Sequence, residues 1–307
     1  MRKFLSTFFT GVGILVVGGC LLGIGSMFAV VQPTELRIKK NSILFLKLDG
    51  VIMDGEKFLE KLRRYRKEDS IKGVLVQINS PGGAVGPSQE IYAELKRTRE
   101  EFKKPVVVSC LSVAASGAYY AAAAADKFIT TPGCMVGSIG VIMEFANLEK
   151  LFDWAKVSRY SIKTGKFKDT GAEYRGMTEE ERQLMQGLVN DVLVQFKSDI
   201  VNGRKMKPEV VDYYADGRVF TGAMAVKYGF ADQTGTLDDA KKVVGEMVGL
   251  GAHPELFKPR SWSRDDWRMF FEEEESSSKM LHRLMDGAVG LQMRGQPLLI
   301  WPGALGI

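Results

Sequence analysis

The order of apolar segments after Asn41 is the feature that most constrains the fold. Short apolar runs alternate there with longer stretches in which apolar residues recur every three or four positions. Strands are predicted at residues 43–48, 74–78 and 106–111, with helices at residues 55–65 and 87–102 between them. Because parallel strands need a crossover connection, this order predicts βαβ units around a largely parallel sheet. The chain is therefore expected to be an α/β protein.

A longer helix is predicted from Thr178 to Asn202. Its first residues, Thr178-Glu179-Glu180-Glu181, fit a capping box, in which the first and fourth side chains bond each other's backbone N–H groups. One face carries the apolar residues Leu184, Leu188, Val192 and Phe196. Gly203 is expected to end the helix, because glycine is common just past helix C-termini.

The first 35 residues are expected to form an uncleaved membrane anchor. Arg2 and Lys3 precede an uncharged stretch at residues 8–31, about the ~20 residues that cross ~30 Å of hydrocarbon. Positive charge before the span places the N-terminus in the cytoplasm and the rest outside, although the basic residues at 37–40 weaken this asymmetry. The expected topology is single-pass, with the following domain on the extracytoplasmic side.

One compact domain is expected at residues 36–250 and a tail at residues 251–307. The tail contains an acidic run, a run of serines and an apolar end at residues 296–307. That end could be an edge strand or plug on the domain's own surface. It could instead enter an active-site groove in extended form, because its sequence imitates an apolar peptide.

Histidine usage restricts the chemistry. His253 and His282 are the only two histidines, so the first 252 residues contain no imidazole. This excludes His-based triads and most zinc sites from the compact domain. The densest basic cluster, residues 61–67, is interpreted as a solvated helix face, so nucleic-acid binding is not expected.

The three cysteines, Cys20, Cys110 and Cys134, have neither the spacing of a metal site nor the density of a disulfide scaffold. All three are interpreted as apolar packing residues.

A glycine turn follows the second predicted strand. Gly82 and Gly83 close the segment Ile78-Asn79-Ser80-Pro81-Gly82-Gly83, at the carboxyl edge of the sheet, where ligands bind in open α/β folds. Glycines there can leave amide N–H groups uncovered, as an oxyanion hole requires. The alternative is a plain turn between a strand and a helix.

Ser116 follows the third predicted strand and precedes an alanine-rich run that favours helix. Free N–H groups at a helix start stabilise negative charge on or beside its oxygen. The residues leave a second reading open, in which Ser116 caps a tightly packed helix.

Two further segments could complete a site: residues 137–141, which include Ser138, and a basic loop with Lys163, Lys166 and Lys168. A lysine acts as a general base only if burial lowers its pKa toward neutrality. Most loop lysines are simply solvated, so the residues alone do not select one.

In order and spacing, these segments resemble peptidase family S49, the signal peptide peptidase A type. The resemblance covers Asn41 to about Leu250. It rests on Asn79-Ser80-Pro81-Gly82-Gly83, Ala115-Ser116-Gly117, Tyr119-Tyr120, Gly137-Ser138-Ile139-Gly140-Val141, Gly165 to Asp169, and Asp216-Gly217-Arg218-Val219-Phe220-Thr221-Gly222. Ala118 departs from it, since many relatives carry a second glycine there.

The resemblance implies a ClpP/crotonase-like fold and a serine endopeptidase that needs no metal or cofactor. Ser116 would be the nucleophile and Lys168 its general base, with Ser138 orienting the lysine. Gly83 and Gly117, with Gly82 beside them, would supply the oxyanion amides. A Ser-Lys pair also suits a histidine-free domain.

For a single-copy chain, the resemblance further implies a homo-oligomer whose dyads form between neighbouring subunits. It implies remnant signal peptides and similar apolar peptides in the membrane as substrates. Two other function classes are kept as alternatives. One is a crotonase-type acyl-CoA hydratase or thioesterase, which an export-facing anchor disfavours, and the other is a non-catalytic membrane scaffold.

Overall fold

The computed structural model describes residues 38–259 and, as backbone, residues 298–300. The predicted anchor, Cys20, His282 and most of the tail lie outside these residues. None of the helices formed by the described residues has the length and apolar character needed to cross a membrane.

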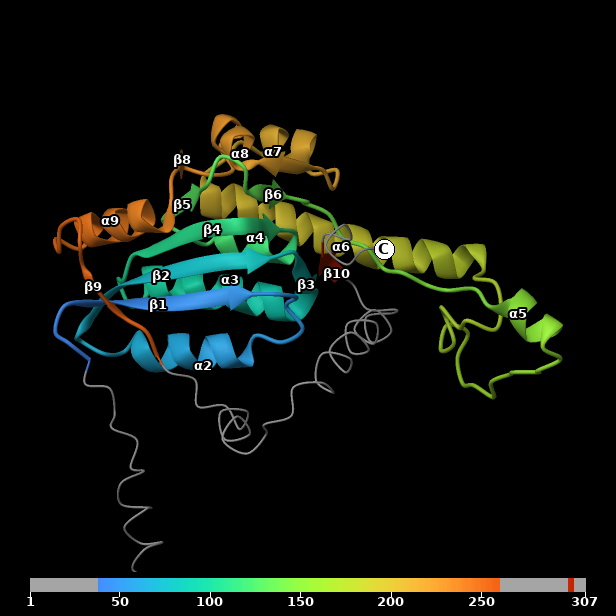
Figure 1. Ribbon diagram of the computed structural model, residues 1–307. Helices are drawn as coiled ribbons and strands as arrows, with labels where there is room; N and C mark the ends of the chain where they lie inside the picture. The colour runs from blue at the N-terminus through green and yellow to red at the C-terminus, as the bar shows by residue number, and fades with distance from the viewer. Residues whose placement is uncertain (1–37, 260–297, 301–307) are drawn as a thin grey trace, which may run out of the picture. The chain divides into compact units, whose positions relative to one another are not determined.

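A mixed sheet forms the centre of this structure (Figure 1). Its strands run in the order β7-β6-β4-β2-β1-β9, with β5 beside β4 and β8 beside β5. They are β1 (Ser42–Asp49), β2 (Ile71–Ser80), β4 (Val106–Ala115), β5 (Lys127–Thr130), β6 (Met135–Gly137), β7 (Val219–Thr221), β8 (Gln233–Thr234) and β9 (Glu255–Phe257). Every pair in the sheet is parallel except β6 with β7. The predicted α/β fold is confirmed.

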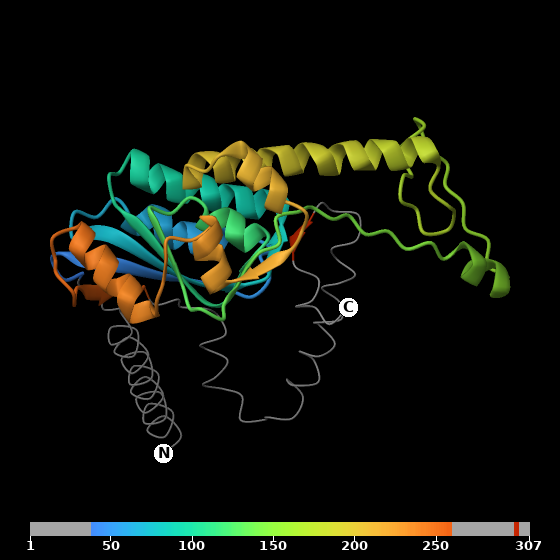
Figure 2. The same cartoon turned by 90° about the horizontal axis from the view of Figure 1, so that it is seen from above.

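Helices cover both faces of the sheet (Figures 1 and 2). The helices of the described residues are α2 (Glu56–Tyr65), α3 (Val85–Glu100), α4 (Gly117–Ala122), α5 (Glu149–Trp154), α6 (Glu179–Arg204), α7 (Pro208–Tyr214), α8 (Gly222–Tyr228) and α9 (Leu237–Met247). Of these, α5 lies away from the sheet. Under α9, one core cluster joins the helix to the sheet and contains Ile43, Phe45, Leu75, Val107, Ile129, Ala240 and Val244. Side chains alternate along a strand, so the other face of β1 presents Leu44 and Leu46, both buried. Burial on both faces is typical of parallel sheets.

The predicted strands and helices are confirmed as β1, β2, β4, α2 and α3. The three strands are two to five residues longer than predicted, α2 is one residue shorter, and α3 has the predicted length but lies two residues earlier. The sheet also continues past Leu250. In β9, Glu255–Phe257 pairs in parallel with the start of β1, and the Phe257 ring packs edge-on against Tyr65 at 4.8 Å. The region 251–307 therefore begins with residues that belong to the sheet.

The long helix is confirmed as α6, with the predicted capping box between Thr178 and Glu181. The prediction that Gly203 ends it is wrong, since α6 continues to Arg204 and Lys205 takes the left-handed conformation at its end. Gly203 serves packing instead, because a Cβ there would lie 2.3 Å from the carbonyl oxygen of Ala123. Glycine is what lets the two backbones approach each other so closely.

The apolar face predicted for α6 is buried only near its C-terminal end. Phe196 is fully buried, whereas Leu184 and Leu188 are 40% and 49% exposed. Figures 1 and 2 show the reason: the N-terminal part of α6 extends beyond the sheet, toward α5. The helix is thus anchored at one end only.

The interpretation of the cysteines as simple packing residues is wrong for two of them. Cys110 in β4 and Cys134 just before β6 form a disulfide, with Cα atoms 6.5 Å apart. Their separation of 24 residues carries no local signal, and they meet because β6 lies next to β4 in the sheet.

Candidate active site

Ser116 lies in the tight turn between β4 and α4. Its φ of 53° and ψ of −120° are unusual for a residue with a side chain, and such strain concentrates at functional sites. Two backbone hydrogen bonds hold it, from its N–H to Gly137 O (2.7 Å) and from Tyr120 N–H to its own carbonyl oxygen (2.8 Å). The turn is therefore set by its neighbours on both sides.

The Ser116 hydroxyl has no structural task within the described part of the chain. The residue is 1% exposed, and its Oγ has no hydrogen-bond partner there. Ser116 occupies the N-cap position of α4, but its side chain makes no capping hydrogen bond, so capping does not explain the hydroxyl group. Buried hydroxyl groups are nearly always bonded, and the exceptions require an explanation such as catalysis.

The glycine turn lies beside this serine. Ser80 at the end of β2 is in register with Ala114, two residues before Ser116. The short strand β3 (Gly82–Ala84) follows, and α4 contacts it. Gly82 has a φ of 97°, and its N–H donates to Ser80 Oγ at 3.2 Å. That bond leaves Gly83 and Gly117 as the candidate oxyanion amides.

Ile52 holds the glycine turn in place, a role that sequence reasoning missed. Its N–H donates to Gly82 O (2.8 Å), and its own carbonyl oxygen accepts from Ala84 N–H (2.7 Å). A Cβ on Gly83 would lie 2.1 Å from that carbonyl oxygen, so no side chain fits there. Ile52 acts through its backbone, and the sequence therefore gives no signal for this role.

Ser138 reaches the same place from β6. Ala115 is in register with Gly137, so Ser116 and Ser138 leave neighbouring strands at the same level. Ser138 is buried, has a φ of 51°, and donates its N–H to Arg218 O at 2.8 Å. The structure thus brings together Ser116, Gly117 and Ser138 with the turn at Gly82 and Gly83.

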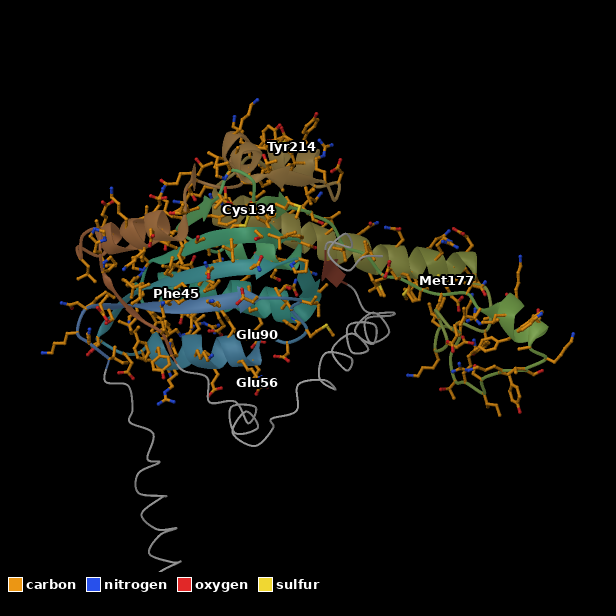
Figure 3. All side chains as sticks on the ribbon, in the orientation of Figure 1. Phe45, Glu56, Glu90, Cys134, Met177 and Tyr214 are labelled. Carbon is orange, nitrogen blue, oxygen red and sulfur yellow. A yellow bond between two sulfur atoms is a disulfide. The ribbon has the colours of Figure 1, made fainter. Side chains whose placement is uncertain are left out.

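Lys168 does not belong to this cluster within one chain. It is exposed in the loop between α5 and α6, which lies at the end of α6 remote from the sheet (Figures 1 and 2). Figure 3 shows Met177, just before α6, at that same end, far from Phe45 in the sheet. At ~1.5 Å per residue, the start of α6 is about 25 Å along the helix from Phe196, which packs on α4.

A charged network fixes the loop that carries Lys168. Arg175 donates to Asp169 (2.7 Å) and to Glu181 (2.5 Å), and Lys163 also pairs with Asp169. These bonds, from Arg175 above all, hold the pKa of Asp169 well below its usual range. The hydrogen bond from Arg175 likewise lowers the pKa of Glu181 to about 2.

The three loop lysines differ in their partners. Lys163 pairs with Asp169, and Lys166 pairs with Glu180. Within residues 38–259, no hydrogen bond or ion pair of the Lys168 ammonium group is found. Of these three lysines, Lys168 is therefore the one that remains available for another partner.

A segment of the tail lies at the glycine turn. Residues Leu298–Ile300 form β10, which pairs antiparallel with β3, Leu299 opposite Gly83 and Ile300 opposite Gly82. α4, the helix that begins after Ser116, contacts β10. An extended stretch of this chain thus occupies the edge of β3 beside the candidate nucleophile (Figure 1).

A strained, buried serine after a parallel strand, next to a glycine turn, is the arrangement of a hydrolase with a serine nucleophile. Residues 98–251, half of the chain, match the model of peptidase family S49, and residues 32–136 match that of Clp protease. The chain belongs to peptidase family S49. It is a serine-type peptidase, a hydrolase that acts on peptides.

Three relatives illustrate this membership. A Synechocystis sp. protein that is provisionally named a protease is 37% identical over 222 residues. These residues cover 72% of this chain and 79% of the length of that protein. An Enterococcus faecium protein, provisionally named signal peptide peptidase SppA, is 32% identical over 70% of this chain and 66% of its own. The chloroplastic serine protease SPPA of Arabidopsis thaliana is 33% identical over 67% of this chain but only 30% of its own length.

Proposed function

We propose that this protein is a membrane-bound endopeptidase whose Ser-Lys dyad forms between two copies of the chain. Ser116 of one copy is the nucleophile, and Lys168 of a neighbouring copy is the general base. The substrates are remnant signal peptides and similar apolar peptides. Residues 8–31 anchor the enzyme by a single span, and residues 36–250 contain the catalytic machinery on the extracytoplasmic side of the cell membrane.

The observation that carries the proposal is a pair of groups that each lack a partner among residues 38–259. Within that range, Ser116 Oγ is buried without a hydrogen bond, and the Lys168 ammonium group has no hydrogen bond or ion pair at the distant end of α6. We call α5, the loop that follows it and the N-terminal part of α6 the arm. Because the arm is anchored only through the C-terminal part of α6 and exposes apolar residues at its other end, it is suited to reach a second subunit. Apolar residues exposed on the arm are Leu151, Trp154, Val157, Tyr160, Ile162, Phe167, Leu184 and Leu188.

In this mechanism, the neutral amine of Lys168 takes the proton of Ser116 as Oγ attacks a peptide carbonyl carbon. Burial against a neighbouring subunit favours the neutral amine. The amides of Gly83 and Gly117 stabilise the oxyanion, and Ser138 orients the lysine by a hydrogen bond. The ammonium group then protonates the leaving amine, and a water deprotonated by the same lysine hydrolyses the acyl-enzyme.

The pairing of β10 with β3 suggests how a substrate binds. An extended peptide can add to the edge of β3 as an antiparallel strand and gain affinity from main-chain hydrogen bonds. This mode of binding accepts substrates of many sequences, because its hydrogen bonds are made to the main chain of the peptide. It would present a scissile carbonyl to the turn that bears Ser116.

Labelling with a fluorophosphonate tests the dyad in the detergent-solubilised full chain. The wild type should be labelled on Ser116, while Ser116→Ala should take up no probe and Lys168→Ala should react far more slowly. Both variants should fold and assemble, yet hydrolyse peptides at less than about 1% of the wild-type rate. Either variant keeping more than a few per cent of wild-type turnover would sink the assignment.

Topology requires a separate measurement. A reporter fused after Leu250 should be active only on the extracytoplasmic side, and a cytoplasmic signal would mean that the basic residues at 37–40 determine orientation.

The two rival functions have less support. Membership of a peptidase family disfavours an acyl-CoA hydratase, and a scaffold does not account for the unbonded serine.

A further inference from the structure

The disulfide joins two segments that each lead directly to the candidate site. Cys110 lies in β4, six residues before Ser116, and Cys134 lies four residues before Ser138. Both cysteines are 1% exposed, and Figure 3 shows Cys134 at the upper edge of the sheet. The covalent loop that the bond closes contains Ser116 and all of α4.

At the disulfide, β4 changes its neighbour. Up to Cys110, which is in register with Thr130, β4 pairs with β5, and from Val113 onward it pairs with β6. The residues between, Leu111 and Ser112, are exposed and are in register with neither strand. The register of β4 with β2 also shifts nearby, between Ile78 and Ser80. The sheet is therefore least regular just before the nucleophile.

The position of Ser116 depends on β6, which has few other attachments. Ser116 N–H donates to Gly137 O, the last residue of β6 (2.7 Å). β6 has three residues, and its other neighbour, β7, also has three. Because the ladders of β6 are short, their hydrogen bonds hold this strand only weakly. The disulfide, which lies just before the first residue of β6, holds it covalently.

We propose that the Cys110–Cys134 disulfide is a positioning element of the active site, which holds β6 against β4 so that Ser116 and Ser138 keep their productive places. The oxidised form is then the active form, and reduction loosens the site while the rest of the domain stays folded. The inference rests on the proposed function. It also matches the predicted location, because structural disulfides persist in oxidising compartments.

The effect of reduction should be local. A dithiol reductant passes two electrons and two protons to the cystine: the Sγ–Sγ bond breaks, two thiols form, and the dithiol closes to its own disulfide. In the reduced form, the two sulfur atoms must lie at about van der Waals separation, about 3.5–4 Å, instead of the about 2 Å of a disulfide bond. The segment before β6 must therefore move, or the cysteine side chains must rotate. The core cluster under α9 contains neither cysteine and is left intact.

The test uses the full chain in detergent with Cys20→Ala in the background, so that only the pair can respond. The oxidised protein is compared with the same protein after dithiothreitol, with the redox state confirmed by thiol alkylation and mass spectrometry. The readouts are the rate of fluorophosphonate labelling at Ser116, kcat and KM for a peptide ester, and far-UV circular dichroism at the assay temperature. The matched control is Cys110→Ala with Cys134→Ala, which no reductant can change.

Reduction should slow labelling and lower kcat by roughly tenfold or more, because small displacements of a nucleophile are costly. KM and circular dichroism should change little, and reoxidation should restore the rate. The double-alanine protein should show the low rate with or without dithiothreitol. Equal labelling of the oxidised and reduced forms, or a loss no larger than the unfolded fraction, would overturn the inference alone. Absence of labelling in the oxidised form would overturn the proposed function as well.

Discussion

The ring of Tyr120 in α4 stacks on Phe196 of α6, with centroids 4.4 Å apart and planes inclined by only 8°. Tyr120 OH also donates a 2.5 Å hydrogen bond to Asp199 of α6, and burial together with that carboxylate raises the pKa of Tyr120. Since Tyr120 lies four residues after Ser116, this contact joins the nucleophile's helix to the helix that carries the Lys168 loop at its other end.

Gly203 should be critical for the packing of α6 against the end of α4. Gly203→Ala puts a methyl group 2.3 Å from the backbone oxygen of Ala123, so the backbones must separate, at a cost of about 1–3 kcal/mol in unfolding free energy. Urea denaturation measures the loss. Gly187→Ala in the same helix is the control, because its Cβ meets nothing within 4 Å, and it should be neutral or stabilising by up to ~1 kcal/mol. Equal effects of the two substitutions would refute the packing role of Gly203.

Mixing two inactive proteins tests whether the dyad crosses a subunit boundary. Ser116→Ala retains Lys168, and Lys168→Ala retains Ser116, so a heterologous interface between them regenerates one intact site. With random assembly at equal amounts, about one quarter of the interfaces should be complete, and the mixture should reach about one quarter of wild-type turnover. The measurement needs subunit exchange before assay. A mixture as inactive as its components, after exchange has been verified, would mean that the dyad lies within one chain.

The network around Arg175 should position Lys168. Arg175→Ala removes the hydrogen bonds to Asp169 and Glu181, frees the loop, and should lower kcat by roughly tenfold while Ser116 still folds into its turn. Lys166→Ala, which removes an exposed ion pair with Glu180 and a contact with the exposed Phe167 ring, is the control and should change little.

The same network makes a prediction for pH. Since the folded pKa of Glu181 is about 2 and that of Asp169 is also depressed, their stabilisation of the loop is full above the unfolded values near ~4 and is lost as pH falls toward about 2. The protection factors of the loop amides, which correct for the pH dependence of intrinsic exchange, should therefore fall between pH 4 and pH 2 in the wild type. In Arg175→Ala, these protection factors should already be low at neutral pH. Identical exchange profiles for the two proteins would contradict this role for Arg175.

Local patterns were sufficient to predict part of this molecule, and the reasons are physical. Strands such as β2 can be recognised in the sequence because nearly all of their residues are buried and the strand is therefore a run of apolar residues. The capping box at Thr178 can be recognised because it lies within four consecutive residues. Gly203 was misread because glycine suits both a helix end and a close approach, and only the position of Ala123 decides between them.

The features that could not be predicted depend on distant parts of the chain. The Cys110–Cys134 bond and the clamp formed by Ile52 exist because strands that are far apart in sequence lie side by side. The candidate site was predictable where a strand ends in a distinctive turn, at Ser116 and Gly83. The separation of Lys168 from Ser116 within one chain was expected only from the family resemblance, which implies dyads between neighbouring subunits. No local pattern indicates it, because it follows from how far α6 projects past the sheet.

The pairing of β10 with β3 makes the C-terminal segment a candidate self-ligand. Leu299 lies opposite Gly83, at the edge where we propose that substrates bind, and a tethered strand competes at high effective concentration. Deleting residues 296–307 should therefore raise the turnover of a small peptide ester and leave the melting temperature nearly unchanged. Leu299→Pro in the full chain should have the same effect, because proline cannot donate to a strand partner. Deleting residues 303–307 alone, beyond the paired strand, is the control and should leave the rate near that of the wild type. A lower melting temperature with unchanged turnover would show instead that β10 is a structural edge strand of the domain.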